Sequence, residues 1–199
     1  EKVRIYLGIA QEYYENDQLK TKTFADSMML ISTRIGYKKG IANACNSLAV
    51  YYMISGLEDS ALLYYNKALQ LRTELKDKKG VAAVYNNIGA LYDKKGDYPQ
   101  ALKYYLESLK LKENLDDKLG TANTAHNVAN IYTTQHNLDD ALTMYKKAFT
   151  LYTELKDTNG LAVVYQGTGL CYYYQFKDSL ALVNFTAALA LDEKIFDLN

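Results

Sequence analysis

Apolar side chains follow a helical rhythm along this chain. Between residues 81 and 94 they fall at i, i+1, i+4, i+7 and i+8, at positions Val84, Tyr85, Ile88, Leu91 and Tyr92. This spacing predicts an amphipathic helix that buries one face. A second stripe of the same kind continues toward residue 115, at positions Ala101, Leu102, Tyr105, Leu109 and Leu111.

Small and polar residues separate the two stripes and predict where the helices end. Gly96 suits the end of the first helix, and Asp97 suits the N-cap of the second. Pro99 then falls in the first turn, where its missing N–H is tolerated. Asp117 is placed to cap the helix that follows. Residues 80–119 are therefore predicted to form two antiparallel helices.

The same pattern returns every forty residues. Glycine, tyrosine, alanine and aspartate recur at this interval, at Gly40, Gly80, Gly120 and Gly160, at Tyr52, Tyr92, Tyr132 and Tyr172, at Ala61, Ala101, Ala141 and Ala181, and at Asp77, Asp117, Asp157 and Asp197. A fixed period of this length is typical of stacked-repeat proteins. The chain is predicted to be all-α, a single array of about ten antiparallel helices in units of about 1–37, 38–77, 78–117, 118–157 and 158–199. Because it starts at Glu1, we expect it to be a segment of a longer protein.

Small and bulky residues face each other within each unit. Small residues lie in the middle of the first helices, at Ala49, Gly89, Ala129 and Gly169, and bulky rings lie on the second helices, at Tyr65, Tyr105, Tyr145 and Phe185. A glycine inside a helix costs about 1 kcal/mol relative to alanine. We therefore expect the two helices of a unit to approach closely at these positions.

This arrangement resembles the tetratricopeptide repeat, which places an aromatic residue, Leu-Gly and Tyr on one helix and Ala, Phe and a small residue on the next. In residues 80–119 the matching positions are Tyr85, Ile88, Gly89, Tyr92, Ala101, Tyr105 and Ser108, and the first unit matches more loosely through Tyr6, Ile9, Ala10 and Tyr13. The period of 40 is similar to that of kinesin light chain, the Pins-type adaptors and many bacterial regulators. The resemblance implies a right-handed superhelix of about five helix hairpins that binds a protein or an extended peptide.

The resemblance also implies that the first helices of the units line a concave groove. Polar side chains follow the groove side of these helices, at Asn43, Asn46, Asn86, Asn87, Asp93, Asn123, His126, Asn127, Asn130 and Gln166. An asparagine amide both donates and accepts hydrogen bonds, so these residues are candidates for binding a peptide backbone. The alternative is that they were copied with the repeat and only satisfy helix ends or solvent. The sequence does not decide between the groove and the convex face.

Charge and composition argue against other classes of function. Lys and Arg together number 23, as do Asp and Glu, so no concentrated basic surface is available for nucleic acid. No apolar run is long enough to span a membrane. Cys45 and Cys171 lie three repeats apart, too far for a disulfide, and His126 and His136 have no cysteine nearby to complete a metal site. We expect no metal, no cofactor and no enzymatic activity, because no nucleophile–base pair is visible.

The last helix is apolar where an inner helix is charged. No residue from 179 to 191 carries a charge, and Lys103, Glu107 and Lys110 are replaced by Val183, Ala187 and Ala190. A terminal repeat normally presents a polar outer face. We expect this stripe to be covered by a further repeat, a downstream helix or a second copy of the chain, and the isolated chain to form a homodimer through it.

Two classes of function remain for the groove. The first is a protein- or peptide-binding adaptor. The second is a regulatory sensor segment of a larger bacterial signalling protein, such as a sensor kinase or a transcription regulator. The composition, rich in Tyr, Lys and Asn and without Trp, favours a bacterial source. The compartment follows the parent protein: the cytoplasm is favoured, and the periplasm applies if the parent is a membrane sensor.

Overall fold

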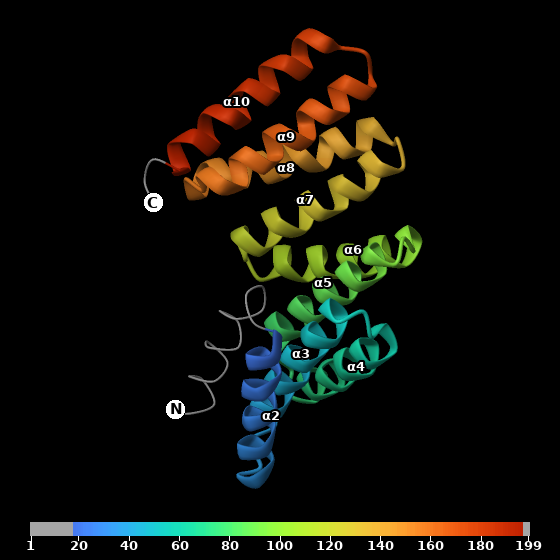
Figure 1. Cartoon of the computed structure of the whole chain (residues 1–199), viewed down its shortest axis with the longest axis vertical. Helices are drawn as coiled ribbons and strands as arrows, with labels where there is room; N and C mark the ends of the chain where they lie inside the picture. The colour runs from blue at the N-terminus through green and yellow to red at the C-terminus, as the bar shows by residue number, and fades with distance from the viewer. Residues whose placement is uncertain (1–17, 197–199) are drawn as a thin grey trace. The chain divides into compact units, whose positions relative to one another are not determined.

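The structure is a computed structural model that describes residues 18–196. Within this range it contains nine α-helices and no strand (Figure 1). They are α2 (Gln18–Arg34), α3 (Lys38–Ile54), α4 (Glu58–Glu74), α5 (Lys78–Lys94), α6 (Tyr98–Asn114), α7 (Lys118–Thr134), α8 (Leu138–Leu155), α9 (Thr158–Tyr174) and α10 (Asp178–Phe196). The all-α fold class is confirmed. The helix expected around Tyr6, Ile9, Ala10 and Tyr13 lies outside the described residues, as does Asp197.

The helices end at tight turns that recur every twenty residues. Each turn contains one residue with positive φ, at Gly36, Gly56, Lys76, Gly96, Asp116, His136, Lys156 and Phe176. At the end of α4, the N–H of Asp77 donates to the carbonyl of Arg72 (2.9 Å) and the N–H of Lys76 donates to Thr73 (3.0 Å). These two bonds form the Schellman motif, which satisfies the last carbonyls of a helix. His136, one of the two histidines, is therefore a turn residue.

The predicted caps are present at the start of the helices. The carboxylates of Asp77, Asp117 and Asp157 accept hydrogen bonds from the N–H groups of the third residues of α5, α7 and α9. Asp97 accepts in the same way from the N–H of Gln100 (3.2 Å), and Pro99 lies in the first turn of α6. The aspartate three residues before the repeated glycine is thus the N-terminal cap of α5, α7 and α9, whereas α3 follows Tyr37 and has no side-chain cap.

The forty-residue glycines are required by close side-chain packing. A Cβ atom at Gly80 would overlap the guanidinium of Arg72, and one at Gly160 would overlap the ring of Tyr152. Arg72 of α4 and Tyr152 of α8 occupy the same position of their repeats, eight residues before the glycine. The glycine therefore lets the end of one hairpin lie directly against the start of the next.

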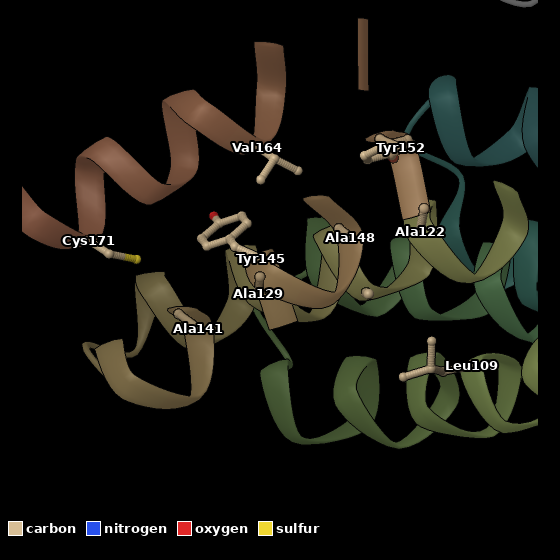
Figure 2. Packing of buried hydrophobic residues seen from close by; sticks show 10 residues of the cluster. Leu109, Ala122, Ala129, Ala141, Tyr145, Ala148, Tyr152, Val164 and Cys171 are labelled. Carbon is tan, nitrogen blue, oxygen red and sulfur yellow. The ribbon is translucent and has the colours of Figure 1, made fainter. Parts of the chain in front are cut away.

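The chain divides into two compact units that are each larger than one repeat: the first unit is residues 1–104 and the second unit is residues 105–199. In the first unit, α2, α3, α4 and α5 pack in sequence order, and the buried side chains include Ala49, Tyr65 and Ile88. In the second unit, α7, α8, α9 and α10 pack in the same way. Figure 2 shows the core of this second unit, where the ring of Tyr145 lies near Ala129, Ala141 and Val164.

The predicted pairing of small and bulky residues holds in this core. Tyr65, Tyr105 and Tyr145 are each at most 2% exposed. Phe185, at the same position of α10, packs against Gly169, where an added Cβ would lie 2.8 Å from its ring. Phe185 nevertheless remains 39% exposed. The difference arises because a following helix covers Tyr145, whereas no helix of the described residues covers this side of α10.

Candidate functional site

The predicted groove residues lie on first helices that contact each other within each unit. In the first unit α3 contacts α5, and in the second unit α7 contacts α9. The exposed members of the set are Asn123, Asn130 and Gln166. The other members, which are half-buried, are Asn43, Asn46, Asn86, Asn87, Asp93, His126 and Asn127. Burial to this degree indicates that many of these side chains already have partners inside the protein.

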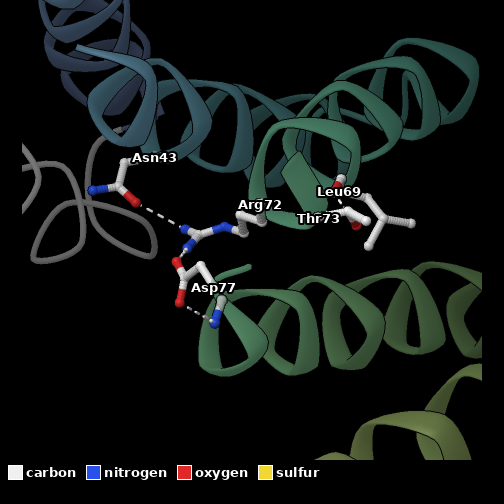
Figure 3. A network of polar contacts seen from close by, with 6 residues as sticks. Asn43, Leu69, Arg72, Thr73 and Asp77 are labelled. Carbon is white, nitrogen blue, oxygen red and sulfur yellow. Dashed lines mark hydrogen bonds and ion pairs between the residues drawn. The ribbon is translucent and has the colours of Figure 1, made fainter. Parts of the chain in front are cut away.

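In the first unit the asparagines are tied to neighbouring helices. The guanidinium of Arg72 donates from Nη2 to Oδ1 of Asn43 and from Nη1 to Oδ2 of Asp77, both at 2.8 Å (Figure 3). Asn87 donates from Nδ2 to Oδ1 of Asn46 at 3.1 Å, which links α5 to α3. These amides therefore join helices to each other, a role that neither interpretation of the sequence predicted.

Two further groove residues of the first unit differ from each other. Asn86 has an interaction within the chain. The carboxylate of Asp93 makes no hydrogen bond or ion pair with the residues that the structure describes, and burial raises the pKa of this carboxyl. Asp93 is thus a half-buried acid whose charged form is disfavoured by its surroundings.

In the second unit, tyrosines fix the orientation of two asparagines. Tyr152 donates its hydroxyl to Oδ1 of Asn123, and Tyr145 donates its hydroxyl to Oδ1 of Asn130, both at 2.6 Å. Neither amide makes another side-chain hydrogen bond within the described part of the chain. Since the oxygen is held by the tyrosine, the Nδ2 group and its two donors face outward. These two asparagines therefore present hydrogen-bond donors at an exposed surface.

The partners of these asparagines follow a simple spacing rule. Asn43 and Arg72 are separated by 29 residues, and so are Asn123 and Tyr152. In the intervening repeat, Ala83 stands at the position of Asn43 and offers no side-chain oxygen, and Lys112 stands at the position of Arg72. The Lys112 ammonium instead donates to Oγ1 of Thr124 at 2.6 Å, and burial lowers its pKa.

A pocket opens between α7 and α9 and has a volume of about 580 Å³. We call it the α7–α9 pocket. Its polar lining comes from His126, Asn130, Thr133, Thr134, Tyr145 and Gln166, and its remaining lining comes from Val163, Gly167, Leu170 and Phe185. The pocket thus brings together three predicted groove residues, His126, Asn130 and Gln166. A surface hollow of about 560 Å³ elsewhere, beside Lys147, contains none of the predicted residues.

The α7–α9 pocket carries no charged group at neutral pH. No Lys, Arg, Asp or Glu lines it. Burial lowers the pKa of His126, although a hydrogen bond with Asn127 acts in the opposite direction. Burial raises the pKa of Tyr145 to about 12, so its hydroxyl stays protonated. The pocket is therefore neutral, with one polar side and one apolar side.

Of the residues that line this pocket, the sequence identified His126, Asn130 and Gln166 as groove residues. Tyr145 and Phe185 were assigned to the core, where the pattern of bulky residues places them. Val163 was not predicted because it is aliphatic, although other repeats have Asn43 and Asn123 at its position. The available signal was Gly167, which stands where neighbouring repeats have Asn87 and Asn127. A glycine in place of a groove side chain leaves space beside it.

The C-terminal helix exposes two neighbouring apolar stripes. Of the residues predicted for self-association, Val183 is 63% exposed, Ala190 is exposed and Ala187 is half-buried. A second stripe is formed by Leu182, Phe185 and Leu189. The residues of α8 equivalent to this second stripe are Leu142, Tyr145 and Phe149, which pack into the core of the second unit. The second stripe therefore matches the face that an inner helix gives to the next repeat.

Residues 18–196 contain two cysteines and no cluster of side chains typical of a metal site. No group of three or more His, Cys, Asp or Glu side chains is arranged to hold a metal ion in this range. Cys45 and Cys171 are buried free thiols, and burial raises the pKa of both. Among these helices, none is both long enough and apolar enough to cross a bilayer.

Comparison with known proteins gives a family match over most of the chain. The tetratricopeptide repeat family matches residues 40–114 and 120–194. No curated protein sequence matches the chain.

Several solved structures share the fold at low sequence identity. BtubC (BKLC) from P. vanneervenii is 17% identical with a TM-score of 0.74, over 97% of this chain and 89% of that one. A Rap protein complexed with Competence and Sporulation Factor is 17% identical with a TM-score of 0.80, over 99% of this chain and 63% of that one. Aspartyl phosphate phosphatase F from Bacillus subtilis is 12% identical with a TM-score of 0.75, over 96% of this chain and 60% of that one.

Proposed function

The chain belongs to the tetratricopeptide repeat family, and on this basis we propose that it is a protein-interaction scaffold that binds an extended peptide along α7 and α9. The observation that carries the proposal is the pair of oriented amides at Asn123 and Asn130. Each holds its oxygen against a tyrosine and turns two donors outward. A surface that presents donors without a charge suits the carbonyl groups of a peptide backbone.

The spacing of the two amides fits a peptide. Asn123 and Asn130 are seven residues apart on α7, which corresponds to about 10 Å along a helix axis. An extended chain advances roughly 3.3 Å per residue, so the two donors match carbonyl groups about three residues apart. The asparagines of the first unit, Asn43, Asn46 and Asn87, are engaged in holding helices together and contribute less.

A peptide selection tests this proposal. A displayed library of random decapeptides is selected on the protein, and the best peptide is then titrated against variants. Replacing both Asn123 and Asn130 by alanine removes two hydrogen bonds of about 1 kcal/mol each and should weaken binding roughly 30-fold. Asn66→Ala on α4 removes an exposed amide far from α7 in the sequence and should change nothing. Recovery of no specific peptide, or equal affinity for the double variant, would contradict the proposal.

A second proposal concerns α10, which we infer to be a self-association surface formed by Val183, Ala187 and Ala190. Exposed apolar stripes of this kind mark interfaces. Sedimentation should show a concentration-dependent dimer, and Val183→Lys with Ala187→Glu should leave a monomer. Leu182→Lys with Leu189→Glu is the matched variant on the neighbouring stripe. If only this second variant dissociates the dimer, the interface is the stripe of Leu182, Phe185 and Leu189, which an inner helix would bury against the next repeat. A wild-type protein that is monomeric at every concentration would reject both stripes as interfaces.

The alternative function is a regulatory segment of a larger signalling protein. It is favoured by the fold shared with a Rap protein that was solved in complex with Competence and Sporulation Factor and with an aspartyl phosphate phosphatase of Bacillus subtilis, each longer than this chain. Peptide binding to α7 and α9 would then change the activity of an attached domain. The reading frame of the parent gene decides this point, because a frame without any further domain would reject it.

A further inference from the structure

The α7–α9 pocket differs from the corresponding place in the first unit. There, Asn87 of α5 fills the position of Gly167 and donates to Asn46, which occupies the position of His126. In the second unit Gly167 has no side chain, and a Cβ there would overlap the ring of Tyr145. The glycine thus makes room for the ring of Tyr145 beside α9, and no side chain at this position bridges α9 to α7 as Asn87 bridges α5 to α3.

The open side of this pocket is apolar and accessible. Val163 is 38% exposed, Leu170 is 36% exposed and Phe185 is 39% exposed, and all three line the same pocket. Leu170 stands where α7 has Asn130 and Val163 stands where it has Asn123. The two first helices therefore differ in what they give the pocket: α7 supplies polar side chains, whereas α9 supplies Val163 and Leu170 beside the amide of Gln166.

The pocket also disfavours charge. With His126 neutral, Tyr145 protonated and no acidic or basic side chain in the lining, a charged group entering it would lose hydration without finding a counter-ion. An aliphatic or aromatic side chain would instead leave water for contact with Val163, Leu170 and Phe185.

We propose that the α7–α9 pocket is a specificity site that accepts one uncharged apolar side chain of the bound peptide. This inference rests on the proposed peptide-binding function and adds the class of residue that the site recognises. The backbone beside that side chain lies against α7, where Asn130 donates to a carbonyl group, and the side chain points toward α9. In the first unit the position of Gly167 is held by Asn87, whose side chain is bound to Asn46.

The decapeptides selected on the wild-type protein provide the first test. One position should be restricted to Leu, Ile, Met, Val or Phe. In synthetic copies of the best peptide, Lys or Asp at this position should weaken binding at least tenfold, whereas the same changes elsewhere should have smaller effects. Binding is measured by titration with a fluorescently labelled peptide.

Variants of the protein provide the second test. Leu170→Asp puts a charge at the exposed rim and should weaken the same peptide at least tenfold. Leu106→Asp is the control, because Leu106 is 41% exposed and does not line the pocket. The equivalent residues of the neighbouring repeats are Asn66 and Lys146, so this position accepts polar side chains. Gly167→Asn restores the side chain present in the first unit and should also weaken binding. Its thermal melt shows whether it folds, and Leu170→Asp carries the test if it does not.

The outcomes separate this inference from the function on which it rests. If no peptide is selected at all, the peptide-binding function fails. If peptides are selected but tolerate Lys and Asp at every position, or bind Leu170→Asp as well as the wild type, the pocket is not a specificity site while peptide binding stands. Restriction to apolar residues together with sensitivity to Leu170→Asp supports the inference.

Discussion

Replacing Tyr145 by alanine is expected to lower the free energy of unfolding by about 3–5 kcal/mol, the range found when a buried aromatic ring is truncated. Tyr145 is 2% exposed, and its ring lies among the side chains of α7, α8 and α9 (Figure 2). Removing the ring leaves a cavity that these packed helices cannot close. The change also removes the hydroxyl that donates to Asn130, which adds a lost hydrogen bond to the lost packing.

The matched control is Phe185→Ala, at the same position of the next repeat. Phe185 is 39% exposed and touches Gly169 on one side only. Its truncation should cost about 1–2 kcal/mol, because less apolar surface returns to water. Urea denaturation followed by circular dichroism measures both. Equal losses for the two variants would show that the burial seen at Tyr145 has no energetic consequence.

Replacing Asp77 by alanine should destabilise the protein by about 3 kcal/mol, since it leaves a largely buried arginine without its carboxylate. The side chains of Arg72 and Asp77 are 11% and 18% exposed, and the ion pair is 2.8 Å long. Asp77 also caps α5 by accepting from the N–H of Gly80. Asn43 would remain the partner of Arg72, but a neutral amide does not balance the guanidinium charge.

Asp157→Ala separates the two roles of this aspartate. Asp157 caps α9 in the same way, accepting from the N–H of Gly160 at 3.0 Å. In this repeat Tyr152 stands at the position of Arg72, so replacing Asp157 removes no ion pair. This variant should cost about 1 kcal/mol, the usual effect of losing an N-cap. The difference between the two variants measures the ion pair, and a difference near zero would mean that the pair contributes nothing to stability.

The sequence predicted the helices well because the signals for them are local. The cap at Asp117, the proline in the first turn of α6 and the small residues facing Tyr65 and Tyr145 all depend on neighbours within one hairpin. A forty-residue period repeats these local signals and so reinforces each of them. The turns were less predictable, because Lys76 and Phe176 adopt a positive φ that glycine would normally supply.

The groove was predicted less completely because its chemistry depends on distant partners. The sequence places Asn43 and Asn123 on the same stripe but does not show that Arg72 and Tyr152 hold their oxygens. The forty-residue period makes Asn87 and Gly167 equivalent positions, although Asn87 bridges two helices and Gly167 lines a pocket. Such differences follow from side chains on other helices, 29 residues away for Arg72 and Tyr152 and 41 residues away for Asn46 and Asn87, and no periodic pattern contains them.

The 29-residue contacts also govern how repeats of this protein can be recombined. The contact of Asn43 with Arg72 lies within one hairpin, and so does the contact of Asn123 with Tyr152. The capping aspartate that follows each hairpin, Asp77 or Asp157, lies in the turn that leads to the next hairpin. Chimeras cut at that turn would keep Arg72 with Asn43 and Tyr152 with Asn123. A cut in the loop between α3 and α4 could instead join α3 to a second helix like α6, so that a lysine equivalent to Lys112 would stand opposite Asn43. The hairpin, with both of its helices together, is therefore the smallest module that such a chain can duplicate or exchange without losing its internal bonds.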